Sequence, residues 1–246
     1  MKLGHFYFSK EGVRIKSNHE NLVYLSSTFS KLLKRSFGKG PETCNVFLKG
    51  NRFYVYMRNF ITPAEEVLIK QDKLELAVDF RSSIINAVTE DYLTEVSKVL
   101  GITFDHFFHD WNYDKNTGIL LFDHSQSDHE ENLDNTFESN LFALIENVGS
   151  SYYKKPASLK VIKFTQNICA IESNEVLLPL ERLVYEKGNF ELLLRQAREI
   201  KKGYWENKGQ FEGIFNRLIE DMFMMWDYKN NRNFLVFIFN RLYTMN

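Results

Sequence analysis

The hydrophobic and polar positions of residues 21–57 switch from a helical period to a strand period. From Asn21 to Phe37, apolar residues recur at three- and four-residue intervals, which predicts an amphipathic helix. Gly38 follows where a left-handed C-terminal cap usually lies. Two short apolar runs, 44–48 and 52–57, are separated by Lys49-Gly50-Asn51 and predict a β-hairpin.

A second helical segment is predicted to begin after Thr62. Thr62 is a good N-cap, Pro63 has the backbone angle that suits the first helical position, and Glu65 can return a hydrogen bond to the cap. Helical periodicity continues up to Gly101, with a break expected near Gln71-Asp72.

Two further strand-like runs complete this part of the chain. Residues 102–110 and 117–123 predict a second hairpin, which turns through residues 112–116. The resulting order, α-β-β-α-β-β, predicts an α+β fold in which helices cover one face of a four-stranded antiparallel sheet.

The chain repeats this pattern. Trp111-Asn112-Tyr113 reappears 115 residues later as Trp226-Asp227-Tyr228, and Pro41 reappears at the same offset as Pro156. Chance would have to reproduce the order, the spacing and the local pattern together, so we predict a tandem duplication.

The second unit is expected to follow the first after a polar linker. In Asp123–Glu138, nearly all residues are polar or charged, so this stretch has little to bury. In the second unit, Pro179 to Met225 is predicted as a long helical stretch with a break at Gly203 or Gly209. The predicted divisions are a first domain with an N-terminal extension, a linker, and a second repeat: 1–123, 124–138 and 139–246. Within the extension, residues 1–17 alternate weakly and suggest an edge strand.

Composition narrows the class of protein. The 246 residues are 44% hydrophobic with only 12 Gly and 4 Pro, which excludes a disordered or collagen-like chain. A net charge of -1 gives no excess of positive charge for nucleic acid, so we expect no nucleic-acid partner. The two cysteines, Cys44 and Cys169, favour a reducing, cytoplasmic setting without a structural disulfide. No apolar run approaches the roughly 20 residues of a membrane-spanning helix.

Gly38-Lys39-Gly40-Pro41 is the segment most suggestive of phosphate binding. It lacks the spacing and the final Ser or Thr of a P-loop, and it ends a helix instead of opening one. Its simpler interpretation is a helix cap followed by a stop. The basic residues Lys31, Lys34, Arg35 and Lys39 leave an acidic partner or lipid headgroups open as alternatives to a solvated face.

Histidines and aspartates are concentrated between residues 105 and 129. Positions 106 and 109 of a strand point to opposite faces, so we expect no metal site and assign none. Arg81 lies in an apolar helical stretch and must find a partner or reach water, and a pair with Asp110 is conceivable. No nucleophile or nucleotide-binding motif is present, so we assign no catalytic residue and no cofactor.

The run from about Leu25 to Asp123 resembles the MpsC domain of a proposed bacterial sodium-translocating, membrane-potential-generating system. The resemblance depends on Gly38-Lys39-Gly40-Pro41, on the helix start Ile61-Thr62-Pro63-Ala64-Glu65, on Arg81, and on a strand that begins at Gly101-Ile102 and ends near Asp110. If the family signature serves more than folding, the resemblance implies a ligand or interaction site made of nine signature residues: Gly38, Lys39, Gly40, Pro41, Thr62, Pro63, Glu65, Arg81 and Asp110.

The second half reads as a degenerate copy of this domain. Lys154-Lys155-Pro156 replaces the Gly-Lys-Gly-Pro segment, Leu178 replaces the threonine, and Gln196 and Met225 stand 115 residues after Arg81 and Asp110. Only the first unit therefore retains the signature, and the second would supply packing surface.

The resemblance implies a cytoplasmic accessory or interaction protein, in the cytosol or peripheral to the membrane. Its partner would belong to an ion-coupled transport or inorganic-carbon uptake system. The alternative is a sensor that binds a small ligand, such as an anion, between the two repeats. An enzyme of unrecognised type is the weakest reading, and both a monomer with an internal pseudo-dimer and a homodimer stay open.

Overall fold

The structure is a computed structural model that describes residues 19–50, 52–124 and 133–244, the last four by their backbone alone. The expected edge strand in residues 1–17 and most of the predicted linker lie outside these ranges. The first half contains α1 (His19–Phe37), β1 (Thr43–Lys49), β2 (Arg52–Arg58), α2 (Pro63–Lys70), α3 (Leu74–Leu100), β3 (His106–Asn112) and β4 (Thr117–Asp123). The second half contains α4 (Asn135–Gly149), β5 (Ser158–Phe164), β6 (Ile168–Asn174), α5 (Pro179–Glu186), α6 (Phe190–Glu206), α7 (Lys208–Phe215), β7 (Arg217–Asp227) and β8 (Arg232–Thr244).

The predicted helix boundaries in the first half are confirmed by their caps. Gly38 and Gly101 adopt φ angles of 75° and 66°, the left-handed region that glycine reaches without strain. Thr62 and Glu65 form a complete capping box, with Pro63 in the first turn of α2. The helix breaks after Lys70, where the sequence predicted an interruption.

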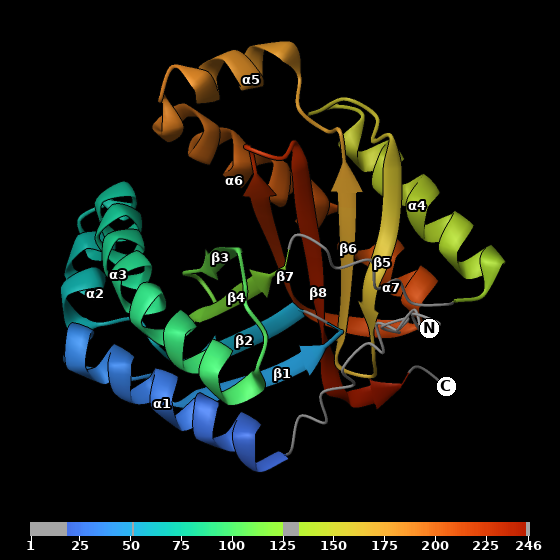
Figure 1. Cartoon of the computed structure of the whole chain (residues 1–246). Coiled ribbons are helices and arrows are strands. Elements are labelled where there is room, and N and C mark those ends of the chain that lie inside the picture. Colours follow the sequence, from blue (N-terminus) through green and yellow to red (C-terminus); the bar gives the residue numbers. More distant parts are fainter. Residues whose placement is uncertain (1–18, 51, 125–132, 245–246) are drawn as a thin grey trace, which may run out of the picture.

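The two halves share one sheet topology. Each contains a four-stranded antiparallel sheet, with strand order β1-β2-β4-β3 in the first half and β5-β6-β8-β7 in the second. In each case the helices of that half lie on one face of the sheet (Figure 1). The α+β class and the duplicated arrangement of elements are therefore confirmed.

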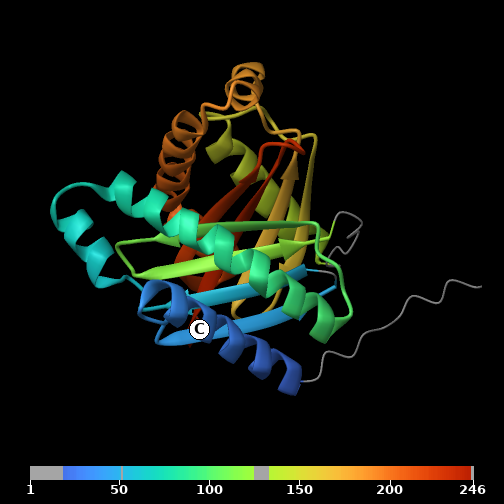
Figure 2. The ribbon, with the colours of Figure 1, turned by 60° about the vertical axis from the view of Figure 1, so that its left-hand side comes forward.

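The uncovered faces of the two sheets pack against each other, which gives a helix-sheet-sheet-helix sandwich (Figures 1 and 2). The strands of one sheet run across those of the other. Tyr54 and Leu121 of the first sheet and Phe223, Phe234 and Val236 of the second belong to this shared apolar core. Central strands are therefore buried on both faces, with alternate residues directed to the helices and to the other sheet.

Buried ion pairs tie the sheets together at one side of this core. Arg52 of β2 contacts Asp123 at 2.8 Å and Glu172 of β6 at 2.7 Å. Arg232 of β8 contacts the same two carboxylates at 2.8 Å and 3.2 Å. Because removal of one member of such a group leaves a buried charge unpaired, the network fixes how the two halves meet.

The long helix predicted from Pro179 to Met225 is wrong over residues 216–225. Helical structure ends at Phe215, Asn216 follows with a φ of 50°, and the chain then forms β7. Four consecutive residues of this strand, 222–225, are buried because the strand is covered on both faces. A continuous apolar run carries no alternation, so its period does not distinguish a strand from a buried helix. The helical part has two breaks: one after Glu186, which the sequence did not predict, and one at Asn207, between the two predicted glycines.

Two other boundaries differ from the sequence prediction. The strand expected from residue 102 begins at His106, because Ile102 and Phe104 pack under the helices before the chain enters the sheet. Helix α4 begins at Asn135, capped by the side chain of Asp134, so the end of the predicted linker is helical. The division into two domains at residues 124–138 stays a prediction.

Candidate functional site

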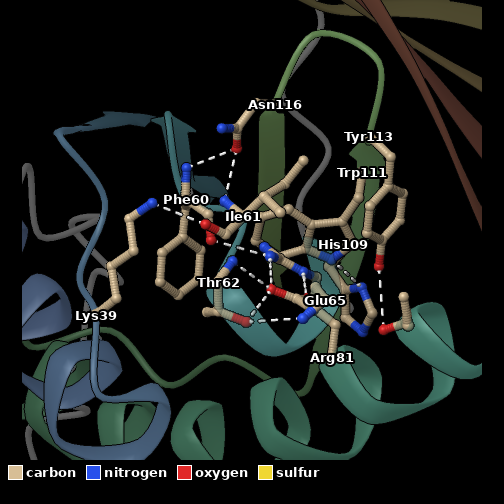
Figure 3. Close-up of polar contacts among 11 residues, drawn as sticks. Lys39, Phe60, Ile61, Thr62, Glu65, Arg81, His109, Trp111, Tyr113 and Asn116 are labelled. Carbon is tan, nitrogen blue, oxygen red and sulfur yellow. Dashed lines mark hydrogen bonds and ion pairs between the residues drawn. The ribbon is translucent and has the colours of Figure 1, made fainter. Parts of the chain in front are cut away.

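Glu65 and Arg81 form a buried ion pair at the centre of the first half (Figure 3). The guanidinium donates from Nε to Oε1 and from one Nη to Oε2 of the carboxylate, both at 2.6 Å. The Thr62 backbone N–H and hydroxyl donate to the same carboxylate at 2.8 Å and 2.7 Å. This bidentate geometry is the strongest form of the Arg-carboxylate interaction. We call these three residues the Glu65–Arg81 cluster.

Aromatic rings enclose the guanidinium of Arg81. Its central carbon lies 4.3 Å from the ring centre of Trp111 and 4.8 Å from that of Phe60, with Phe37 and Tyr113 farther out. The arginine is 1% exposed. The positive charge is thus stabilised by one carboxylate and by aromatic faces, without contact with water.

The cluster holds the connection between β2 and α2. Arg81 donates to the Phe60 carbonyl at 3.0 Å, and Lys39 donates to the Ile61 carbonyl at 2.8 Å. The Asn116 side chain, from the β3–β4 turn, accepts bonds from the backbone N–H groups of Phe60 and Ile61, each at 2.7 Å (Figure 3). Helix α3, the β3–β4 turn and the segment after α1 therefore all bond to the connection between β2 and α2.

The Gly-Lys-Gly-Pro segment contributes packing and one lysine to this arrangement. Gly38 is the left-handed cap of α1, and a Cβ on Gly40 would lie 3.2 Å from the Ser30 carbonyl oxygen. The segment thus follows a helix end closely, and Pro41 stands just before β1. Of the nine signature residues in the sequence, Lys39, Thr62, Glu65 and Arg81 converge directly on the Phe60–Ile61 connection. Pro63 belongs to the same helix start.

Asp110 lies elsewhere, at the contact between the two halves. Its carboxylate accepts bonds from Lys201 of α6 at 2.7 Å and 2.9 Å, and from the Met224 backbone N–H at 2.8 Å. The conceivable Arg81–Asp110 pair is therefore wrong, since each residue has a different partner. The reason is the way in which the elements pack. Asp110 faces Lys201 on a helix of the second half, whereas Glu65 at the start of α2 lies beside Arg81 of α3.

The second half repeats the architecture of the Glu65–Arg81 cluster without its positive charge. Glu181 accepts a bond from the Leu178 backbone N–H at 2.6 Å, and Gln196 donates to its other oxygen. Asn231 accepts from the Leu177 N–H at 2.8 Å, as Asn116 does in the first half. Burial raises the pKa of Glu181 above its ordinary value, although these hydrogen bonds oppose the rise.

Sequence reasoning missed Asn116, Asn231 and Lys201. The two asparagines stand at the repeat offset of 115, and both adopt positive φ, 53° and 54°. Their shared position in a predicted hairpin turn, next to the repeated Trp-x-Tyr motif, was a signal that could have identified them. Lys201 had no local signal, because its partner is 91 residues away.

The remaining candidate groups are accounted for by local contacts. His109 accepts a bond from the Trp111 indole N–H at 3.1 Å, and burial lowers the pKa of His109 to about 4. His124 contacts Asp105 at 3.1 Å. Among the described residues, no group of three or more potential ligands is arranged to hold a metal. Two of the basic residues after and within α1 have separate partners: Arg35 contacts Asp91, and Lys39 donates to the Ile61 carbonyl.

The arrangement offers positioned charges but no accessible reactive group. The side chains around Arg81 pack without a cavity that would admit even a water-sized molecule. Every polar atom of the Glu65 carboxylate is engaged by Thr62 or Arg81. Such a cluster stabilises a particular backbone conformation.

Comparison with known proteins agrees with the resemblance noted from the sequence. Residues 19–125 match the family model described as Na+-translocating membrane potential-generating system (MpsC). No curated protein and no solved structure matches the chain. Within the described ranges, no helix is both long enough and apolar enough to cross a bilayer. The match begins with α1 and includes β4, so the first α-β-β-α-β-β unit of this chain is the part that matches the MpsC family.

Proposed function

We propose that the protein is a non-catalytic accessory component of an ion-coupled membrane system and acts by binding a protein of that system. The observation that supports this proposal is the closed Glu65–Arg81 cluster, in which residues of the family resemblance hold the largely buried connection between β2 and α2 in one conformation. The description of the family supplies the system: one that translocates Na+ and generates a membrane potential. Inorganic-carbon uptake is one process that such a system would energise.

The second half acts, in this proposal, as a degenerate MpsC copy and a built-in partner of the first. Strand β3 contacts its counterpart β7, where Asn112 donates to Asp221 at 2.8 Å and Thr117 donates to the same carboxylate. Contacts between equivalent elements are typical of a two-fold homodimer interface. The chain would thus contain, in covalent form, the dimer that a single-domain relative would build from two copies.

The anion sensor with a site between the repeats receives no support from a specific observation. Among the described residues, the apolar core and the network around Arg52 and Arg232 occupy the contact between the sheets. The accessory role is therefore the function that we carry forward.

Affinity capture from native membranes tests the proposal. The full chain, tagged and expressed at its natural level, is purified in mild detergent, with an untagged strain as the control. We expect integral subunits of an ion-coupled transporter to be enriched. A deletion strain should show a reduced Na+-dependent membrane potential or poor growth at low carbon dioxide. No enriched transporter subunit together with an unchanged deletion strain would refute the proposal.

A further inference from the structure

Exposed apolar side chains are concentrated in two helical hairpins, one in each half. We call residues 62–80, which include α2 and the start of α3, the first tip, and residues 178–196, which include α5 and the start of α6, the second tip. Of the twelve large hydrophobic side chains exposed among the described residues, ten lie in these tips. They are Val67, Leu74, Leu76 and Phe80 in the first tip, and Leu178, Leu180, Leu183, Phe190, Leu192 and Leu194 in the second.

The short helices of the tips bury a carboxylate and expose apolar side chains. Helix α2 buries Glu65 completely and leaves Val67 54% exposed, and α5 buries Glu181 and leaves Leu180 67% exposed. A surface helix usually does the opposite, with its apolar side toward the core. Because the carboxylates must face inward to hold the preceding connection, the apolar residues of these helices are left for a partner.

The exposed apolar positions coincide in the two tips at an offset of 116 residues. Val67 corresponds to Leu183, Leu74 to Phe190 and Leu76 to Leu192, and all six side chains are exposed. The buried arginine of the first half has meanwhile become Gln196. The surface of the tips has thus kept its apolar character although a central polar interaction has changed.

Two pairs of charged positions in the tips differ in sign at the same offset, whereas a third pair, Glu75 and Glu191, has the same sign. Glu66 corresponds to Arg182, and Lys70 corresponds to Glu186. All four side chains are exposed, and none forms an ion pair within the described ranges. A contact that brings equivalent positions of the two tips together therefore places apolar residues against apolar residues and each of these four charges opposite its counter-charge.

The first tip lies at the left of both views and the second at the top (Figures 1 and 2). Glu75, next to the turn of the first tip, contacts Arg195 at 3.0 Å and Arg198 at 3.2 Å near the base of the second tip, which holds the two hairpins beside each other. One partner molecule can therefore engage both tips at once.

We infer that the tips are a dimerisation surface, on which the first tip of one molecule binds the second tip of a second copy and the reverse. The two contacts are equivalent, so the assembly closes as a two-fold dimer. The charge signs favour this pairing over contacts between two first tips or two second tips, where Glu66 or Arg182 would face its own kind. The inference does not depend on the proposed function.

Sedimentation velocity of the purified full chain over a range of concentrations tests the inference. The wild type should form a species of twice the 29.1 kDa chain mass. Leu76→Asp should weaken association at least about a hundredfold, because each dimer contains the buried leucine twice. Val23→Asp is the matched control, because Val23 on α1 is also 54% exposed but lies outside the tips, and it should leave the dimer intact.

Charge reversal tests the pairing itself. Arg182→Glu and Glu66→Arg should each weaken the dimer about tenfold, and the double variant Glu66→Arg/Arg182→Glu should restore it, since the opposite signs return. A wild type that stays monomeric, an equal loss in Val23→Asp, or a double variant weaker than both singles would overturn the inference. Flotation with phosphatidylcholine–phosphatidylglycerol vesicles tests whether a lipid surface binds the tips instead of a second copy. A monomeric wild type that binds these vesicles, and loses this binding in Leu76→Asp, would also overturn the inference.

Discussion

Arg81→Gln gives the first half the interaction that the second half has, and we expect it to destabilise the fold by about 3–5 kcal/mol, the usual cost of breaking a buried ion pair. The substitution removes both guanidinium bonds to Glu65 and the bond to the Phe60 carbonyl. It also removes the cation held 4.3 Å from the Trp111 ring centre. The bonds from Thr62 remain and offset part of the loss.

The magnitude follows from the charge that is left behind. Hydrogen bonds to charged groups contribute about 1.5–3 kcal/mol each, and an enclosed cation-aromatic contact about 2 kcal/mol. A shorter neutral glutamine recovers one of these interactions, as Gln196 does with Glu181. With the lowest of these values, three lost bonds and the aromatic contact, less one recovered bond, come to about 5 kcal/mol, so a net loss at the upper end of the stated range is expected.

Urea unfolding followed by far-ultraviolet circular dichroism measures the effect. The control is Glu65→Gln/Arg81→Gln, which leaves no buried charge and should recover about 2 kcal/mol of the loss. A loss below about 1 kcal/mol in the single variant, or a double variant that equals the sum of the two singles, would refute the reasoning.

Three further predictions concern packing and titration. In urea unfolding, Gly118→Ala should lower the free energy of unfolding by at least about 1–3 kcal/mol, because the new Cβ would lie 2.0 Å from atoms of the Trp111 ring. The control is Gly213→Ala, whose Cβ would have no atom within 4 Å, and it should be neutral or slightly stabilising. Because burial raises the pKa of Glu181, the native state binds a proton that the unfolded chain has released, so stability should fall as pH rises above about 4.5. Glu181→Gln should flatten this slope in unfolding experiments between about pH 4 and pH 7. His109, with its pKa lowered to about 4, should stay neutral at pH 5 in NMR titration, and its contribution to stability should decline as pH falls below the ordinary value of 6.5.

The sequence by itself determined the local structure of this protein. The caps at Gly38, Thr62 and Gly101 were predictable because each depends on residues within a few positions along the chain. The α-β-β-α-β-β order and its repetition were predictable for the same reason, since hydrophobic period and turn residues act locally. The order of the signature residues also sufficed to identify the MpsC resemblance, which the match over residues 19–125 confirms.

Only the tertiary structure decided which side chains meet. The choice of Glu65 over Asp110 as the partner of Arg81 depends on where a helix packs above the sheet, and no local pattern encodes that distance. Strand β7 was mistaken for a helix because a second sheet covers its other face and removes the alternation. Burial on both faces and pairing across many residues are properties of the packed sandwich, so the pattern of one segment could not reveal them.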